Sequence, residues 1–327
     1  MSETKSDRVA DAPADIWVYR LLPKWLWPYA QLARWDRPIG WWLLLWPCWW
    51  SLALAFGLWS NEPGTNFTQH TDLLLMPLLF FFWLGAVMMR GAGCSYNDLV
   101  DVNIDLKVAR TASRPIPSGR VSKKQVIAFT MMQCAVGFVC LLAISTIGHL
   151  SFSWFVFWLG VSSLLIVAIY PFAKRVTDWP QLVLGLAFSW GALMGWASVF
   201  GELSLAPLLL YAGCILWTIG YDTIYAHQDK EDDALIGVRS TARLFGDKTK
   251  LALTILYSLT LILFAAAFYQ AFAAWPAYIG LLAGGGHMIW QIRTLDINNA
   301  DNCLALFKSN TKFGWIIFAG LLAALVV

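Results

Sequence analysis

Residues 73–89 read LLLMPLLFFFWLGAVMM, a run without a charged side chain that ends at Arg90. A helix needs about 20 mostly apolar residues to cross the hydrocarbon core of a membrane. Similar runs recur along the chain, which is 59% hydrophobic and 13% charged, whereas a soluble domain is normally about 25% charged. The sequence therefore predicts an all-α, polytopic membrane protein.

Nine runs are long and apolar enough, or nearly so, to be predicted as membrane-spanning helices. They are Ile39–Trp59, Leu73–Met89, Val126–Ile147, Phe152–Tyr170, Leu182–Phe200, Leu203–Ile219, Leu251–Phe272, Trp275–Gln291 and Phe313–Val327. The last two are short. The net charge is only +3, which is too small to indicate nucleic acid as a partner.

The basic residues orient these spans. Of the 23 Lys and Arg residues, all but Arg90 lie in the N-terminal segment or in the loops after spans two, four, six and eight. Basic residues mark the cytoplasmic side of a membrane protein. This distribution predicts a cytoplasmic N-terminus and a C-terminus on the opposite side.

The N-terminal segment is polar and acidic, with Glu3, Asp7 and Asp11 among its first residues. Acidic residues argue against a mitochondrial transit peptide. We expect residues 1–30 to form a mobile cytoplasmic segment and residues 31–327 to form the transmembrane domain. We also expect the chain to be integral to the bacterial inner (cytoplasmic) membrane.

An acidic cluster follows span two. Residues 97–105 read NDLVDVNID and place Asn97, Asp101 and Asp105 at every fourth position, along one helical face. Carboxylates at this spacing repel each other, and a divalent cation would remove the repulsion. Magnesium prefers oxygen ligands of this kind together with substrate phosphates. A solvated helix end is the alternative explanation for a single cluster.

A second acidic cluster follows span six. Residues 222–233 read DTIYAHQDKEDD, with Asp222, Asp229 and Asp233 on one helical face. Asp101 and Asp105 precede Asp229 and Asp233, respectively, by 128 residues, with four spans between. This spacing indicates a parallel repeat, in which two four-helix units face each other across a central cavity and a ninth helix packs outside. Two matched clusters favour a metal site over two solvated helix ends.

Basic residues flank both clusters and could neutralise a diphosphate. Arg90 lies seven residues before Asn97, two helical turns back on the same face. An arginine within a span is a candidate functional residue, with snorkelling to the membrane surface as the alternative. Arg110, Arg114, Lys174 and Arg175 could complete a cradle for the anion, although each could equally set the topology.

With these residues in view, the chain resembles the UbiA superfamily of membrane prenyltransferases, and specifically its 4-hydroxybenzoate polyprenyltransferase branch. The resemblance covers about residues 32–244 and consists of six motifs in order. They are Arg34-Trp-Asp36-Arg37-Pro38-Ile-Gly40, Asn97-Asp98-x-x-Asp101-x-x-x-Asp105, Arg110-Thr-Ala-Ser-Arg114-Pro115-x-Pro-Ser-Gly119, Tyr170-Pro171-Phe-Ala-Lys174-Arg175, Tyr221-Asp222-Thr with Asp229-x-x-x-Asp233, and Gly237-x-x-Ser240-Thr241. The Leu43–Pro47 run favours the 4-hydroxybenzoate branch.

The resemblance implies nine helices around a cavity, with magnesium bridging a polyprenyl diphosphate. It implies that the metal ligands are Asn97, Asp101, Asp105, Asp222, Asp229 and Asp233. It also implies that Arg90, Arg114 and Lys174 hold the diphosphate. Arg175 is then the first candidate for the carboxylate of the aromatic acid, and Arg34 is the second.

These parts suggest ionisation of the diphosphate followed by electrophilic attack on the acceptor ring, ortho to its hydroxyl. Aromatic side chains would shield the allylic cation through cation–π attraction. The candidates are Tyr96, Tyr170, Trp190, Trp217 and Tyr221. A carboxylate such as Asp222 could take up the ring proton. The acceptor could also be another aromatic compound.

Two other protein classes were weighed. A transporter for divalent ions or phosphorylated solutes would carry charged residues near the middle of the membrane, and the predicted spans are almost free of charge. A CDP-alcohol phosphotransferase needs a glycine where this chain has Val102, and the acids it requires after Gly119 are absent. Both alternatives are therefore disfavoured.

Overall fold

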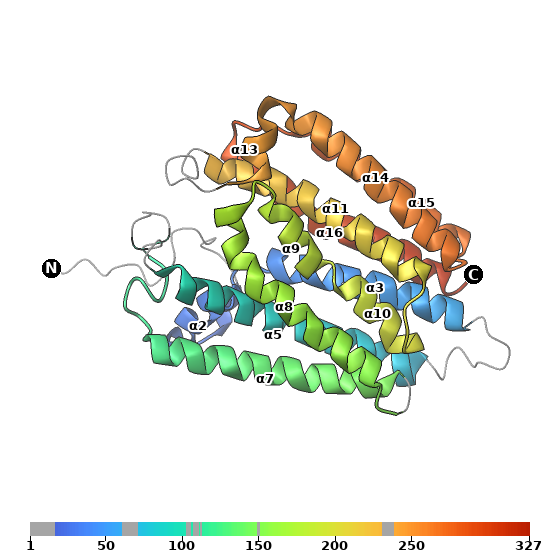
Figure 1. Ribbon diagram of the computed structural model, residues 1–327, viewed down its shortest axis with the longest axis horizontal. Helices are drawn as coiled ribbons and strands as arrows, with labels where there is room; N and C mark the ends of the chain where they lie inside the picture. The colour runs from blue at the N-terminus through green and yellow to red at the C-terminus, as the bar shows by residue number, and fades with distance from the viewer. Residues whose placement is uncertain are drawn as a thin grey trace. The chain divides into compact units, whose positions relative to one another are not determined.

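The computed structural model describes residues 17–60, 71–102, 106, 111, 113–148, 151–230 and 239–327 (Figure 1). Every regular element in these ranges is a helix. The longer ones are α3 (Ile39–Ser60), α5 (Met76–Val100), α7 (Lys123–Ile147), α8 (Trp154–Val176), α9 (Pro180–Phe188), α10 (Gly191–Phe200), α11 (Leu205–Ala226), α14 (Thr249–Gln270), α15 (Trp275–Thr294) and α16 (Ala300–Ala324). The short ones are α1 (Trp17–Leu21), η1 (Lys24–Leu26), α2 (Trp27–Leu32), η2 (Thr71–Leu75), η3 (His227–Asp229), α13 (Thr241–Phe245) and η4 (Gly246–Lys248). The predicted all-α class is confirmed.

Within the part of the chain that the structure describes, six helical stretches are long and apolar enough to cross a membrane. They are Ile39–Ser60, Leu73–Val100, Lys123–Ile147, Pro180–Phe200, Leu205–Ala226 and Thr241–Gln270. The predicted spans that begin at Phe152, Trp275 and Phe313 also coincide with helices, namely α8, α15 and α16. The total of nine spans and the pairing of two four-helix units stay predictions.

The chain divides into two compact units. The first contains Met1–Trp41 and Trp83–Leu141, and the second contains Trp42–Phe82 and Leu142–Val327. The first therefore holds the first acidic cluster with the Arg34–Gly40 motif, and the second holds the second acidic cluster. Each unit is described by itself below.

In the first unit, the segment from Trp17 to the start of α3 contains short helices whose side chains contact one another. Tyr19 donates a hydrogen bond to Asp36 (3.5 Å) and accepts one from Gln31 (3.2 Å). Burial raises the pKa of Tyr19, and the nearby Gln31 amide partly offsets this. Val18 and Asp36 are fully buried. Residues 17–30 of the segment predicted to be mobile thus contain short helices, and residues 1–16 lie outside the described residues.

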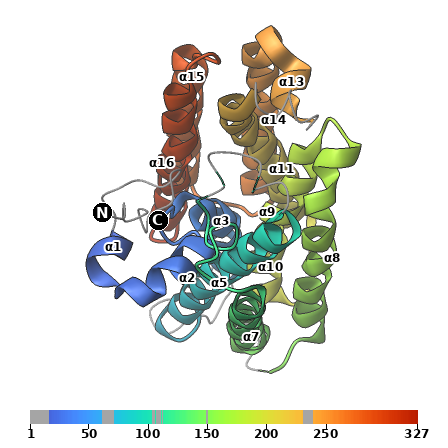
Figure 2. The same ribbon diagram turned by 90° about the vertical axis from the view of Figure 1, so that its left-hand side faces the viewer.

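In the second unit, α11 packs along α14 and also contacts α9, α10 and α16. Gly213 and Gly220 on α11 lie directly against the rings of Phe264 and Tyr257 on α14. The absence of a side chain at these two positions lets the helices approach closely. Helices α15 and α16 run side by side (Figure 2), with Gly280 and Gly320 at their contact.

The predicted span Leu182–Phe200 is interrupted in the structure, because α9 ends at Phe188 and α10 begins at Gly191. Two hydrogen bonds from side chains to backbone carbonyls join this stretch to its neighbours. Trp190 Nε1 donates to Leu159 O at 2.9 Å, and the Ser51 hydroxyl donates to Ala192 O. Of the two acceptors, Ala192 O lies just after the break. The amides across the break bond within the same stretch, as Trp190 N does to Ala187 O and Ala192 N to Ser189 O, so backbone groups there keep the partners that a membrane interior demands. A hydropathy pattern does not report the break, since all of these residues are apolar or small.

Helix α16 begins thirteen residues before the predicted start of the last span, so Lys308 and Lys312 lie on a helix and not in a loop. Polar side chains in α16 find partners on other helices. Asn310 Oδ1 accepts from Trp217 Nε1 at 3.0 Å, and Gln291 Nε2 donates to Ser309 Oγ at 2.9 Å. These bonds remove the cost of burying polar groups. Ser309 and Asn310 are polar, so a hydropathy pattern does not include them in a membrane-spanning helix. Tertiary packing supplies the hydrogen-bond partners that allow them to be buried there.

Gly314 on α16 provides a test of this packing. A Cβ atom at Gly314 would collide with the indole of Trp46, which is fully buried. We predict that Gly314→Ala lowers the melting temperature in detergent, because overpacking of this kind costs about 1–3 kcal/mol. Gly286→Ala is the matched control on α15, since its Cβ would meet nothing within 4 Å. Equal melting temperatures for the two variants would contradict the packing described here.

Candidate functional site

The first acidic cluster lies at the C-terminal end of α5. The amide of Asp101 donates to Asn97 O at 2.9 Å, so the helical turn continues past the last assigned residue of α5. Asn97 and Asp101 therefore lie one turn apart, as predicted from their spacing. Asn97 is half-buried and Asp101 is only 3% exposed. Asp105, the third predicted ligand here, lies outside the described residues.

Asp98 occupies the position next to Asn97 and is 1% exposed. Its Oδ1 accepts hydrogen bonds from Arg34 Nη2 at 2.8 Å and from Arg114 Nη1 at 3.3 Å. Both arginines are largely buried. The structure thus brings Arg34 and Arg114, which were predicted to bind substrate, onto one carboxylate. Asp98 was not a predicted site residue, because it lies off the helical face that Asn97 and Asp101 share.

Arg90 lies on α5, seven residues before Asn97 and on the same continuous helix. Its guanidinium group lies against Gly40, near the start of α3. A Cβ atom at Gly40 would be 2.7 Å from Arg90 Nε and 3.4 Å from Arg90 Cζ. The Arg34–Gly40 motif therefore meets both first-unit arginines that were predicted to hold the diphosphate, Arg114 through Asp98 and Arg90 through Gly40.

The second acidic cluster begins near the end of α11. Asp222 is half-buried, and it follows Tyr221, which is 1% exposed. Asp229 ends the 3₁₀ turn η3, and the structure describes its backbone but not its side chain. Asp233 lies outside the described residues. The prediction that Asp222, Asp229 and Asp233 share a ligand therefore stays a prediction.

The predicted aromatic candidates differ in their surroundings. Trp217 is fully buried, and its ring lies within about 5 Å of the rings of Trp50, Tyr221 and Phe313. Trp190 is held through its indole N–H by α8. Tyr96 is 36% exposed on α5. The packing of Trp217 on three rings points to a structural role for that side chain.

Helix α8 carries the third group of predicted residues. Tyr170 is half-buried, and the chain continues as helix through Lys174 and Arg175 to Val176. The structure describes the backbone of Lys174 and Arg175 but not their side chains. Their roles toward the diphosphate and the aromatic acid remain predictions.

The Ser240-Thr241 motif supports the second cluster from behind. Ser240 caps α13 by accepting from the amide of Arg243 at 3.4 Å. Thr241 hydrogen-bonds Thr223 of α11 at 2.6 Å, and its amide donates to Gln181 Oε1 of α9 at 3.1 Å. These contacts fix α13 to α9 and α11.

His227 follows α11 and is buried. Its Nε2 lies 3.0 Å from Thr249 Oγ1, which itself donates to Gly246 O at 2.7 Å. The threonine hydroxyl therefore accepts, and the imidazole carries its proton on Nε2. Burial, with a smaller effect of Lys230, lowers the pKa of His227 to about 4. The side chain is neutral at pH 7 and ties η3 to the start of α14.

The donor atoms of the two clusters fit magnesium in kind. Asn97, Asp101 and Asp222 supply amide and carboxylate oxygens, the ligands that a hard divalent ion prefers. Among the described side chains alone, no group of three His, Cys, Asp or Glu could hold a metal ion. Three of the six predicted ligands lie outside that set. The donor atoms of the described three therefore fit magnesium in type, and the arrangement of all six stays a prediction.

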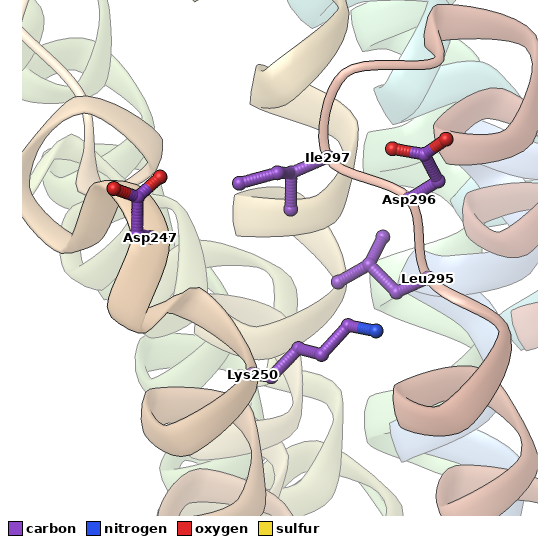
Figure 3. A pocket seen from close by; sticks show the side chains of 5 residues that line it. All are labelled: Asp247, Lys250, Leu295, Asp296 and Ile297. Atoms are coloured by element: carbon purple, nitrogen blue, oxygen red, sulfur yellow. The ribbon is translucent and has the colours of Figure 1, made fainter.

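One small pocket of about 300 Å³ lies in the second unit (Figure 3). It is lined by Asp247, Lys250, Leu295, Asp296 and Ile297. The carboxylates of Asp247 and Asp296 extend from two separate segments of chain, and Lys250 extends from the same segment as Asp247 (Figure 3). This lining contains no predicted site residue, and we assign the pocket no part in the chemistry.

The chain was compared with known proteins. The model of the UbiA prenyltransferase family matches residues 44–321. The chain belongs to the UbiA prenyltransferase family. This match extends beyond the stretch that carries the six motifs, as far as α16.

Two relatives show how close the similarity is. The mitochondrial 4-hydroxybenzoate polyprenyltransferase of Arabidopsis thaliana is 44% identical over 317 residues, which are 97% of this chain and 73% of that protein. The protein of the same name from Caenorhabditis elegans is 43% identical over 91% of this chain and 78% of its own length.

Solved structures give the same fold. The apo structure of a UbiA homolog from Aeropyrum pernix K1 is 26% identical, with a TM-score of 0.66 over 84% of this chain and 97% of that one. A UbiA homolog from Archaeoglobus fulgidus, bound to GPP and Mg²⁺, has a TM-score of 0.59 over 92% of this chain and 100% of its own, at 20% identity. At that identity the second match supports the fold alone.

The buried His227–Thr249 hydrogen bond generates a prediction. Thr249→Val should lower the melting temperature by leaving the imidazole N–H without an acceptor, a loss of about 1–3 kcal/mol for a buried polar group. Thr249→Ser, which keeps the hydroxyl, is the matched control and should melt close to the unsubstituted protein. If the valine and serine variants melt together, the bond contributes nothing to the second cluster's support.

Proposed function

We propose that this chain transfers a polyprenyl group from polyprenyl diphosphate to 4-hydroxybenzoate, at the ring carbon ortho to the hydroxyl, in ubiquinone biosynthesis. The observation that carries the proposal is 43–44% identity to 4-hydroxybenzoate polyprenyltransferases over more than nine-tenths of the chain. The arginines and carboxylates at the end of α5 agree with it, because a diphosphate needs cationic and metal-mediated neutralisation.

The proposed reaction breaks one carbon–oxygen bond and forms one carbon–carbon bond. The bond between the prenyl carbon and the diphosphate oxygen breaks, and its electron pair leaves with the oxygen. A ring carbon of the acceptor supplies the pair for the new carbon–carbon bond. The ring proton then leaves to a base, for which Asp222 on α11 is a described candidate. Hydrophobic helices around the site exclude the water that would otherwise capture the allylic cation.

The chain's own residues have distinct roles in this proposal. Arg90 and Arg114, with Lys174 from α8, bind the diphosphate and stabilise the negative charge that builds on it. Arg175 binds the carboxylate of the aromatic acid. Arg34, the second candidate for that carboxylate, is occupied by Asp98 and by Gln31 O in this structure, so we favour Arg175.

Magnesium is the proposed cofactor. When bound, it would neutralise diphosphate oxygens as a Lewis acid. The residues proposed to hold it are Asn97, Asp101, Asp105, Asp222, Asp229 and Asp233. This proposal is supported by the oxygen-only donor set.

We propose a bacterial inner (cytoplasmic) membrane as the location, with a cytoplasmic N-terminus and both clusters at the cytoplasmic surface. The loop distribution of Lys and Arg supports this orientation. The relatives named above are mitochondrial proteins, so the proposal rests on this chain's own sequence.

Purified protein in detergent or lipid should form prenylated 4-hydroxybenzoate from a polyprenyl diphosphate with magnesium, and should form none with EDTA. Asp101→Asn and Asp229→Asn should each lower kcat/KM by roughly 100-fold or more, since each removes a ligand charge at the reacting diphosphate. The product is measured by chromatography and mass spectrometry.

Asp301→Asn is the control for this assay, because Asp301 is an exposed carboxylate in the first turn of α16. Its activity should equal that of the unsubstituted protein. Full activity of Asp101→Asn or Asp229→Asn would remove these residues as ligands. Faster use of another phenolic acceptor would change the acceptor and leave the reaction class in place.

A further inference from the structure

Asp98 is placed where it could control the charge and position of Arg114. It is buried at the end of α5, and one oxygen, Oδ1, accepts from both Arg34 and Arg114. The other oxygen, Oδ2, is also buried and has no hydrogen-bond partner among the described residues. All interactions of this carboxylate with described residues are therefore with the two guanidinium groups.

Arg34 is fixed by hydrogen bonds on two nitrogen atoms of its guanidinium group. Its Nη1 donates to Gln31 O at 2.6 Å while Nη2 donates to Asp98. Its backbone adopts φ of 57°, in the left-handed region that few residues other than glycine occupy. A chain turn just after α2 thus presents the guanidinium group to Asp98, and the strain is offset by these bonds.

Asp98 shares its one negative charge between two guanidinium groups. A carboxylate that positioned Arg114 alone would also neutralise it more fully and weaken its attraction for an anion. Arg34 supplies compensating positive charge to Asp98.

Gly40 provides the matching support for Arg90. The Cβ atom of any other residue would approach Arg90 Nε to 2.7 Å and Nη2 to 3.3 Å, so the guanidinium group would have to shift. The ends of the Arg34–Gly40 segment thus hold the two arginines that we assign to the diphosphate.

We propose that Asp98, Arg34 and Gly40 are positioning residues for Arg114 and Arg90, which bind the diphosphate of the prenyl donor: Asp98 and Gly40 set the orientation of the two arginines, and Arg34 limits how far Asp98 neutralises Arg114. In this assignment Arg34 is the counter-ion of Asp98 and does not contact the aromatic acid. The inference rests on the proposed function, because that function assigns Arg90 and Arg114 to the diphosphate.

A charge-compensation experiment tests the proposal. Arg34→Gln removes one positive charge and should raise KM for the prenyl diphosphate by about ten- to a hundredfold, the effect expected for lost charged hydrogen bonds. KM for 4-hydroxybenzoate should stay within about twofold. The double variant Arg34→Gln/Asp98→Asn also removes one negative charge, which restores the original net charge, and should recover much of the lost affinity. A double variant no better than Arg34→Gln would show a purely structural role and overturn the proposal.

Gly40→Ala should likewise raise KM for the prenyl diphosphate, through displacement of Arg90. The matched control is Gly93→Ala on α5, whose added Cβ meets nothing within 4 Å and should leave KM unchanged. Melting temperatures of all variants establish that they are folded. Unchanged KM in a folded Gly40→Ala variant would remove Gly40 from the proposal.

A binding measurement separates this inference from the proposed reaction. Calorimetric titration with inorganic diphosphate and magnesium needs no acceptor. Weaker binding by Arg34→Gln, and recovery in the double variant, would support the positioning role even if 4-hydroxybenzoate were not prenylated. Equal binding by all variants would overturn the inference while leaving prenyl transfer to be judged by product formation.

Discussion

The hydrocarbon core of a membrane offers no hydrogen-bond partner, and this constraint shapes the whole chain. Backbone groups are paired within helices, and most charged residues lie at or beyond helix ends. Where polar side chains enter a helix packed among others, as at Gln291 and Asn310, they bond to neighbouring helices. A carboxylate buried at a helix end therefore needs a partner, and Asp98 has two arginines. The chemistry of the first acidic cluster follows from how these buried charges are balanced.

Much of the helical arrangement could be predicted from hydropathy. Long apolar runs located the helices, and the distribution of Lys and Arg separated the loops. The interruption between Phe188 and Gly191 and the early start of α16 could not be predicted in this way. At the interruption Trp190 donates to a carbonyl of α8, and α16 begins after Asn299, whose side chain caps the helix by accepting from the amide of Asn302. A single-residue hydropathy scale has no information on such partners.

Only part of the candidate site could be predicted from the sequence. Periodicity placed Asn97 and Asp101 one turn apart and Arg90 on the same helix, and the structure has them so. The part played by Asp98 could not be inferred, because it depends on Arg34, which is 64 residues away in sequence. The importance of Gly40 could not be inferred either, because the side chain of Arg90 occupies the space that a Cβ atom at position 40 would need. Motifs in a single sequence show which residues occur together, whereas contacts show which residue supports which.

The central claim is that the two acidic clusters act on one diphosphate, and a double-mutant cycle on kcat/KM tests it most directly. Asp101→Asn, Asp229→Asn and the double variant are compared at saturating magnesium. If the clusters share the ligand, the double variant will be about as slow as the slower single variant, because residues that act as a unit are strongly non-additive. If the two losses multiply instead, the clusters act independently and the account is wrong.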